Sequence, residues 1–338
     1  MQNIRDKFIS AFEKDRDKIK NWLVSWDYQK QLKKRKYAYD NLLNDFFTFS
    51  GKEDLPKWMN WFDKDYPDYT QSKEVEALAL KSLENEKKIF EKLGLPFNQE
   101  NYLNRIGLHN AHDYFLPQSY PLAQRYTINN VLDFGAGYGR QSNLWQGYRN
   151  AGMYVAVDAI ESSYCLQNLY YRSITDNVMD YIEDPDNFKF DKNYKGIVHV
   201  PTWRFDLIPD NSMDLVMCVQ VLPELNSKLI TFIVEQFFRV LKPGGCLYIR
   251  DHAYTWKPSG QIDVEKHLAK NGFVLEFKAH IINDKDIHGV PRIWRKADPE
   301  VIKSQTMDLK AKVKLMYNNA DAMTGGLLKK VTQKLNKT

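Results

Sequence analysis

The sequence predicts an alternating α/β fold built on a mostly parallel β-sheet, and three observations support this. The apolar run before residue 134 passes through glycines at 135, 137 and 139 into a segment that can continue as a helix. Apolar runs over 152–158, 196–200 and 214–220 alternate with helical patterns at 163–172 and 228–241. Two further strand-like runs, 273–280 and 290–295, predict a closing antiparallel pair.

Length and composition favour one main domain with extensions, because 338 residues with 43% apolar side chains can bury one sizeable core. No apolar run reaches the roughly 18 to 20 residues of a membrane span, and the charged N-terminus lacks the apolar centre of a signal peptide. We therefore expect a cytoplasmic protein. Cys165, Cys218 and Cys246 are widely separated, which favours reduced core thiols and predicts no metal site.

The chain divides by pattern into three regions. Residues 1–110 contain few glycines and show helical periodicity, for example over 19–27 and 74–84, which predicts a helical cap. Residues 111–298 carry the alternating pattern of the main domain. Residues 299–338 form a basic tail, in which residues 301–338 hold eight lysines and two aspartates, and the stretch 325–335 is a candidate amphipathic helix. Such a helix can lie on an anionic membrane, or it can be solvated.

Two segments have more than one interpretation. His109 and His112, beside Asp113, could provide a metal site or a base, but no third ligand is near in the sequence, which favours a loop or capping role. Residues 174–195 are longer than an ordinary connection between strand and helix. They predict an insertion at the edge of the sheet, either a lid or an oligomer contact.

The glycine-rich turn predicts a site for a nucleotide-like ligand. The spacing is G-x-G-x-G, which differs from the G-x-G-x-x-G of dinucleotide-binding turns, and Asp133 stands two positions before Gly135. A carboxylate there suits a cationic or amine-bearing ligand better than a phosphate. Asp158 ends the next strand, where an acid can accept hydrogen bonds from ribose hydroxyls or cap the following helix.

The motifs resemble those of class I S-adenosylmethionine-dependent methyltransferases. Residues 133–139 match the D-x-G-x-G-x-G motif of that family, residues 208–216 are similar to its fourth-strand run, and Leu-Lys-Pro-Gly-Gly at 241–245 is similar to its turn into strand five. The resemblance covers roughly 125–297. It implies a Rossmann-like sheet of seven strands with an antiparallel last strand, and S-adenosylmethionine as the cofactor.

The resemblance also implies the residues that bind the cofactor. They come from the glycine turn, the end of the second strand, the loop after the third and the end of the fourth: Asp133, Gly135, Ala136, Gly137, Gly139, Asp158, Ala159, Thr202, Trp203 and Gln220. Thr202 departs from the family pattern, since many members carry an acid there for the adenine amine. The adenine contact is then expected from backbone N–H groups and the Trp203 ring.

A hydroxyl acceptor needs its proton removed, so we expect a general base at the carboxyl ends of the strands. The candidates are His252, Asp251 and Glu224, with His252 favoured. The loop 220–224 lacks the Asn/Asp-Pro-Pro-aromatic motif of nucleic-acid amino methyltransferases, which disfavours a nucleic acid. A loose likeness to bacterial sugar O-methyltransferases predicts a sugar or other small-molecule acceptor.

The alternatives are an RNA methyltransferase, supported by the basic tail, an N-methyltransferase of a small amine, and a cofactor-binding module without catalysis. The sequence leaves the acceptor and the oligomeric state open.

Overall fold

The computed structural model describes residues 4–19, 49–60, 72–119, 127–222, 225–251, 263–278 and 289–296. By its internal contacts the chain divides into two compact units, Met1–Pro209 and Asp210–Thr338. The three regions that the sequence suggests, 1–110, 111–298 and 299–338, remain predictions. The basic tail and most of the helix predicted over 19–27 lie outside the described residues.

The first unit contains four parallel strands in the order β3-β4-β2-β1. Their bounds are β1 (Asn130–Phe134), β2 (Met153–Asp158), β3 (Val178–Asp180) and β4 (Gly196–Pro201). β2 and β4 are buried along their whole length, which explains why their sequences are continuous apolar runs. The three strands predicted in this unit are confirmed. The short β3 is an additional edge strand inside the segment 174–195.

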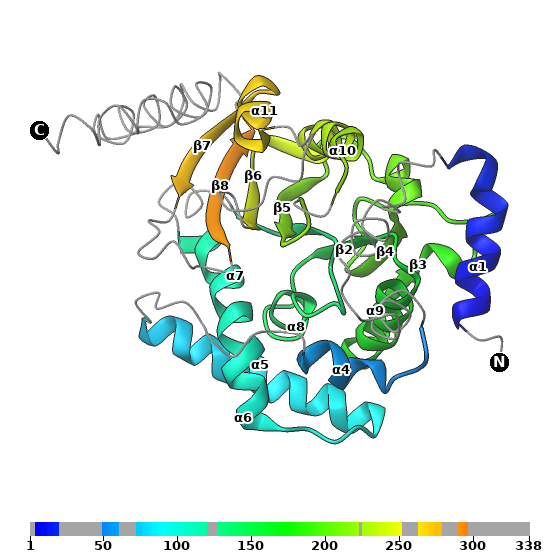
Figure 1. The fold of residues 1–338 in the computed structure, drawn as a ribbon, viewed down its shortest axis with the longest axis vertical. Coiled ribbons are helices and arrows are strands. Elements are labelled where there is room, and N and C mark those ends of the chain that lie inside the picture. The colour runs from blue at the N-terminus through cyan, green and yellow to red at the C-terminus, as the bar shows by residue number, and fades with distance from the viewer. Residues whose placement is uncertain are drawn as a thin grey trace, which may run out of the picture. The chain divides into compact units, whose positions relative to one another are not determined.

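Helices lie beside these strands in the first unit (Figure 1). They are α1 (Ile4–Asp15), α4 (Asp54–Asn60), α5 (Lys73–Leu93), α6 (Gln99–Tyr102), α7 (Leu108–Ser119), α8 (Ser142–Trp145) and α9 (Glu161–Ile174), with the short turns η1 (Arg16–Lys18), η2 (Leu103–Gly107), η4 (Tyr181–Glu183) and η5 (Thr202–Leu207). α5 begins where the Ser72 side chain accepts from the Val75 N–H, and it ends at Gly94 in the left-handed conformation.

The segment carrying His109 and His112 is helical, so the expectation of a loop there was wrong. Both histidines lie on α7, where they are buried. Val75 and Ala79 of α5 form a buried apolar cluster with Ala111 of α7. This tertiary packing stabilises a helix whose own sequence, with Pro117 inside it, is a weak helix former.

The second unit contains β5 (Met213–Val219), α10 (Ser227–Val240), β6 (Leu241–Asp251), α11 (Val264–Lys270), β7 (Phe273–Lys278) and β8 (Val290–Lys296). Its strand order is β5-β6-β8-β7. β5 and β6 are parallel, whereas β8 is antiparallel to both β6 and β7. The Asn226 side chain accepts from the Leu229 N–H and so begins α10.

The strand directions confirm the mixed Rossmann-like fold that the resemblance implies, including the antiparallel last strand. The described strands number eight, one more than predicted, because β3 adds to them. The three cysteines are free and buried, as expected for core thiols. Among the described helices, none is long and apolar enough to cross a membrane.

Candidate cofactor site and active site

The glycine turn between β1 and α8 has the left-handed backbone that its sequence requires. Gly135, Gly137 and Gly139 have φ angles of 69°, 62° and 97°, a region that other residues enter at a cost. The Gly135 N–H donates to the Val157 carbonyl at 2.8 Å, which ties the turn to the end of β2. The two places expected to bind the cofactor are therefore held together by a backbone hydrogen bond.

The second and third glycines of the turn serve different purposes. A Cβ atom at Gly137 would meet only the Trp58 ring of α4, at 4.0 Å, so the backbone there faces open space. A Cβ at Gly139 would lie 2.6 Å from Cε1 of Tyr171 on α9, and something would have to move. Gly137 thus leaves room for a ligand to approach the backbone, whereas Gly139 allows a helix to pack against the turn. The open face at Gly137 fits S-adenosylmethionine.

Asp133 lies under the turn at the end of β1. Its side chain is buried, and its Oδ2 accepts a hydrogen bond from the Tyr154 hydroxyl at 2.6 Å. Burial raises the pKa of Asp133 to about 6, although the bond from Tyr154 and the charge of Arg140 lower it in part. Its charge therefore changes close to the physiological range.

Asp158 ends β2 beside the turn. Its Oδ1 accepts from the backbone N–H groups of Ala159 and Ile160 at 2.7 and 3.0 Å, and its Oδ2 accepts from Gln167 Nε2 at 2.9 Å. Burial raises the pKa of this carboxyl. These two N–H groups precede α9, whose N-cap residue Ile160 has no side-chain capping bond, so Asp158 fixes the turn after β2 and does not cap the helix. A role in binding ribose is compatible with these bonds, because a carboxylate has about four acceptor positions.

Thr202 and Trp203 begin η5, directly after β4, and both are buried. The Trp203 indole N–H donates to Asp15 Oδ2 at 3.3 Å, and the ring contacts Phe8 and Phe12 edge-on at centroid distances of 5.4 and 5.2 Å. These three partners belong to α1, which lies beside α9 in Figure 1. The ring is therefore covered by the first helix on these sides.

In the second unit, Gln220 follows β5 and has a φ of 58°, an uncommon value for a residue with a long side chain. Its backbone N–H donates to the Arg250 carbonyl at 2.7 Å. Such backbone strain is often found at functional sites. Asp251, at the end of β6, is buried and forms an ion pair with Arg292. Glu224 and His252 lie outside the described residues.

The residues that fix the turn to the N-terminal helices carry no local signal in the sequence. Arg140, directly after Gly139, donates from Nη1 to Asn110 Oδ1 at 2.6 Å and from Nη2 to Asp113 Oδ2 at 2.8 Å. Gln141 also donates to Asp113. In the sequence Asp113 stands out only as a neighbour of His112, because these two donors are 27 and 28 residues away, which no local pattern reveals.

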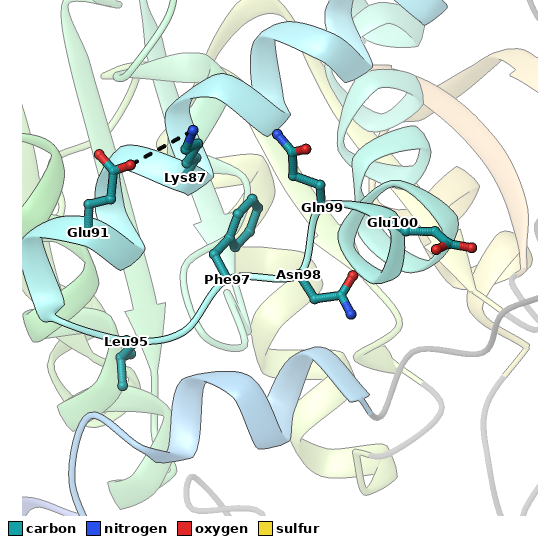
Figure 2. Close-up of a pocket in the computed structure, with 7 residues that line it drawn as sticks. All are labelled: Lys87, Glu91, Leu95, Phe97, Asn98, Gln99 and Glu100. Atoms are coloured by element: carbon teal, nitrogen blue, oxygen red, sulfur yellow. Dashed lines mark ion pairs between the residues drawn. The ribbon is translucent and has the colours of Figure 1, made fainter.

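A surface hollow of the first unit is lined by residues between 87 and 100, which precede the glycine turn in the sequence. Figure 2 shows it between the end of α5 and the start of α6, with Phe97 at its centre and an ion pair between Lys87 and Glu91 at 4.0 Å on one side. None of its lining residues was a predicted site residue. Within the described parts of the chain, no group of three His, Cys, Asp or Glu side chains could hold a metal ion.

The fold and the open glycine turn fit the class of S-adenosylmethionine-dependent methyltransferases, with S-adenosylmethionine as the cofactor. The family comparison agrees, because residues 132–249 match the family described as "Methyltransferase domain". Residues 132–249 are therefore a methyltransferase domain. No curated protein matches the sequence.

Several solved structures are similar to the chain at low sequence identity. One is a methyltransferase from Methanosarcina mazei, with 16% identity, 52% of this chain and 97% of the other covered, and a TM-score of 0.36. Another, from Mesorhizobium loti, has 14% identity, coverages of 53% and 97%, and a TM-score of 0.34. Magnesium protoporphyrin IX methyltransferase from Synechocystis, with S-adenosylmethionine bound, has 12% identity, coverages of 68% and 100%, and a TM-score of 0.40. These values indicate no acceptor.

Proposed function

We propose that the protein transfers the methyl group of S-adenosylmethionine to a hydroxyl of a sugar or another small molecule, in a surface-glycan or natural-product pathway. The observation that carries the proposal is the attachment of the N-terminal helices to the cofactor turn. Trp58 of α4 lies 4.0 Å from the Cβ position of Gly137, and α7 binds Arg140. Helices beside the turn support a small acceptor, because they can supply part of an enclosed acceptor pocket.

The proposed cofactor contacts follow from the chemistry of each side chain. Asp133 faces the cationic part of the cofactor, Asp158 with Ala159 binds the ribose hydroxyls, and Thr202 with Trp203 binds the adenine. The remaining contacts come from the backbone at Gly135, Ala136, Gly137 and Gly139 and from Gln220. The strained backbone of Gln220 supports its place in this set.

When bound, S-adenosylmethionine supplies a methyl group that its sulfonium has already activated. The protein then has to align the acceptor oxygen with the methyl carbon and the sulfur, exclude water and accept the hydroxyl proton. The general base that accepts the hydroxyl proton is proposed to be His252, with Asp251 and Glu224 as the other candidates. The ion pair between Asp251 and Arg292 favours a positioning role for Asp251, because its carboxylate is already bound by the guanidinium.

Two features support partners beyond the small acceptor. The lysine-rich tail supports peripheral contact with an anionic membrane, which would suit a lipid-linked glycan. The same tail is the one observation that favours the alternative of an RNA methyltransferase. The segment 174–195 supports an oligomer contact, because it contains β3, the edge strand in the order β3-β4-β2-β1. We further propose that the protein acts in the cytoplasm.

The test is transfer of labelled methyl from S-adenosylmethionine into a fractionated cell extract, comparing the intact protein with Asp158→Ala. We expect label in the sugar, glycolipid or other small-molecule fractions, and loss of that label in the variant. Label in RNA or protein would refute the proposed acceptor and leave the methyltransferase class standing. Label in a small amine would favour N-methylation. His252→Ala then tests the base, with cofactor affinity as the control that the site is intact.

A further inference from the structure

A buried chain of hydrogen bonds leads from the far strands of the first unit to the cofactor turn. Gln167 of α9 donates from Nε2 to the Gly137 carbonyl at 2.7 Å and to Asp158 Oδ2 at 2.9 Å. Its Oε1 lies 2.9 Å from His199 Nε2 of β4, and His199 Nδ1 lies 2.8 Å from Asp180 Oδ2 of β3. The side chains of Gln167 and His199 are completely buried. Neither was a predicted site residue.

The partners of Gln167 determine which way its amide points. The Gly137 carbonyl and the Asp158 carboxylate are both acceptors, so the amide group that faces them must be the NH₂. The amide oxygen then faces His199, and the ring nitrogen Nε2 must carry a hydrogen to donate to it. A reversed amide would set two pairs of acceptors against each other. The hydrogen-bond pattern therefore allows one orientation.

The other side of His199 is equally determined. Asp180 also accepts from the Tyr164 hydroxyl at 2.7 Å, the Ile182 N–H at 3.1 Å and Asn168 Nδ2 at 2.7 Å. Burial raises the pKa of Asp180, but the charge of His199 and these hydrogen bonds lower it more, to below its ordinary value. An ionised Asp180 only accepts, so Nδ1 of His199 donates as well. The ring also stacks on Tyr164 at a centroid distance of 3.6 Å, which fixes the plane of the imidazole.

We infer that Gln167 is a positioning residue for the cofactor. Its NH₂ group holds together two acceptors that otherwise repel each other, the Gly137 carbonyl of the turn and the Asp158 carboxylate of the ribose site. His199, fixed by Asp180, sets the orientation of that amide. The inference rests on the proposed function of Asp158 as the ribose ligand. Losing the amide frees the carboxylate to turn away from the ribose, although the fold around it is kept.

The first experiment measures binding of S-adenosylhomocysteine by calorimetry, with Gln167→Met as the variant. Methionine keeps the length of the side chain and loses both donors. The matched control is Gln146→Met, which removes another buried amide of the same unit, one that donates to the Ala151 carbonyl at 3.0 Å. We expect Gln167→Met to weaken binding about tenfold or more, and the control to leave it within about twofold. Equal losses in the two variants would refute a positioning role.

A second readout separates positioning from a general loss of structure. The intact protein should bind S-adenosylhomocysteine more tightly than its 2′,3′-dideoxy form, because only the former has ribose hydroxyls for Asp158. Gln167→Met should reduce this preference. When Asp158→Ala is already present, adding Gln167→Met should change the preference little. An unchanged preference in Gln167→Met overturns the inference. No preference in the intact protein instead refutes the ribose role of Asp158, and no binding at all refutes the cofactor site.

Should Gln167→Met fold poorly, Gln167→Glu replaces the donor with an acceptor at nearly the same size. It places a carboxylate oxygen against the Gly137 carbonyl and Asp158, so the preference for the hydroxyls should fall further than in Gln167→Met. A preference equal to that of the intact protein would again overturn the inference.

Discussion

Replacement of Glu86 by glutamine should change how the stability of the protein depends on pH. Glu86 lies on α5 and is completely buried. Its Oε2 accepts from the Tyr170 hydroxyl of α9 at 2.5 Å and from Asn143 Nδ2 of α8 at 2.8 Å. Burial raises the pKa of Glu86 from 4.5 to about 7, and these two hydrogen bonds lower it in part. Glutamine can keep both bonds, since they end on one oxygen.

The sign and size of the effect follow from this pKa. Between pH 4.5 and 7 the folded protein holds a proton on Glu86 that the unfolded chain has lost, so stability falls as the pH rises through this window. Each pKa unit is worth about 1.4 kcal/mol. Integrated from pH 5 to pH 8, Glu86 should remove about 2.5 kcal/mol from the free energy of unfolding, and Glu86→Gln should not.

The assay is urea unfolding of both proteins at several pH values from 5 to 8. The difference between the two curves is the relevant quantity, because other groups titrate in both proteins and because the new NH₂ group adds a constant cost. We expect the difference to change in favour of Glu86→Gln as the pH rises. Tyr170→Phe removes one hydrogen bond to the carboxylate and should move the window to higher pH. Parallel curves for the intact protein and Glu86→Gln would refute the reasoning.

Two further predictions concern the cofactor turn. Gly137→Ala should weaken binding of S-adenosylmethionine with a small loss of stability. Gly139→Ala should lower the free energy of unfolding by about 2 kcal/mol or more, because the new Cβ would clash with the Tyr171 ring and the residue would have to keep a φ of 97°. Calorimetry measures the binding and urea unfolding the stability, and equal behaviour of the two variants would contradict the different roles. Cofactor affinity, measured by calorimetry, should fall up to about tenfold per pH unit below pH 6 as Asp133 gains a proton. If Asp133→Asn shows the same dependence on pH, another group is responsible for it.

The parts of the fold that were predictable from the sequence have local signals. The strand before Gly135 and the strand ending at Asp158 are apolar runs that stop at a glycine or an acid, and both lie where the pattern places them. The three-residue β3 is too short for a periodic pattern. The helix carrying His109 was missed because its stability comes from packing against α5, which is a property of the folded chain.

The candidate site divides in the same way. Glycines at fixed spacing indicate the turn, because the backbone there requires them. The polar residues that support the turn are not readable, because their partners are distant: Gln167 is 32 residues from His199, and Arg140 is 27 from Asp113. The one local signal of this network is His199, an ionisable side chain within the apolar run of β4. Roles for Glu224 and His252 remain predictions.

The position of α1 has a consequence for the order in which the chain can fold. Its partners are far along the sequence: Arg5 binds Glu161, 156 residues later, and Asp15 accepts from Tyr181 and Trp203, 166 and 188 residues later. During synthesis α1 emerges before all of these partners, and its binding surface exists only once the chain has been made to residue 203. Closing such long loops is slow. Docking of the N-terminal helix should therefore be a late folding step, and until then the Trp203 ring remains accessible to other apolar surfaces.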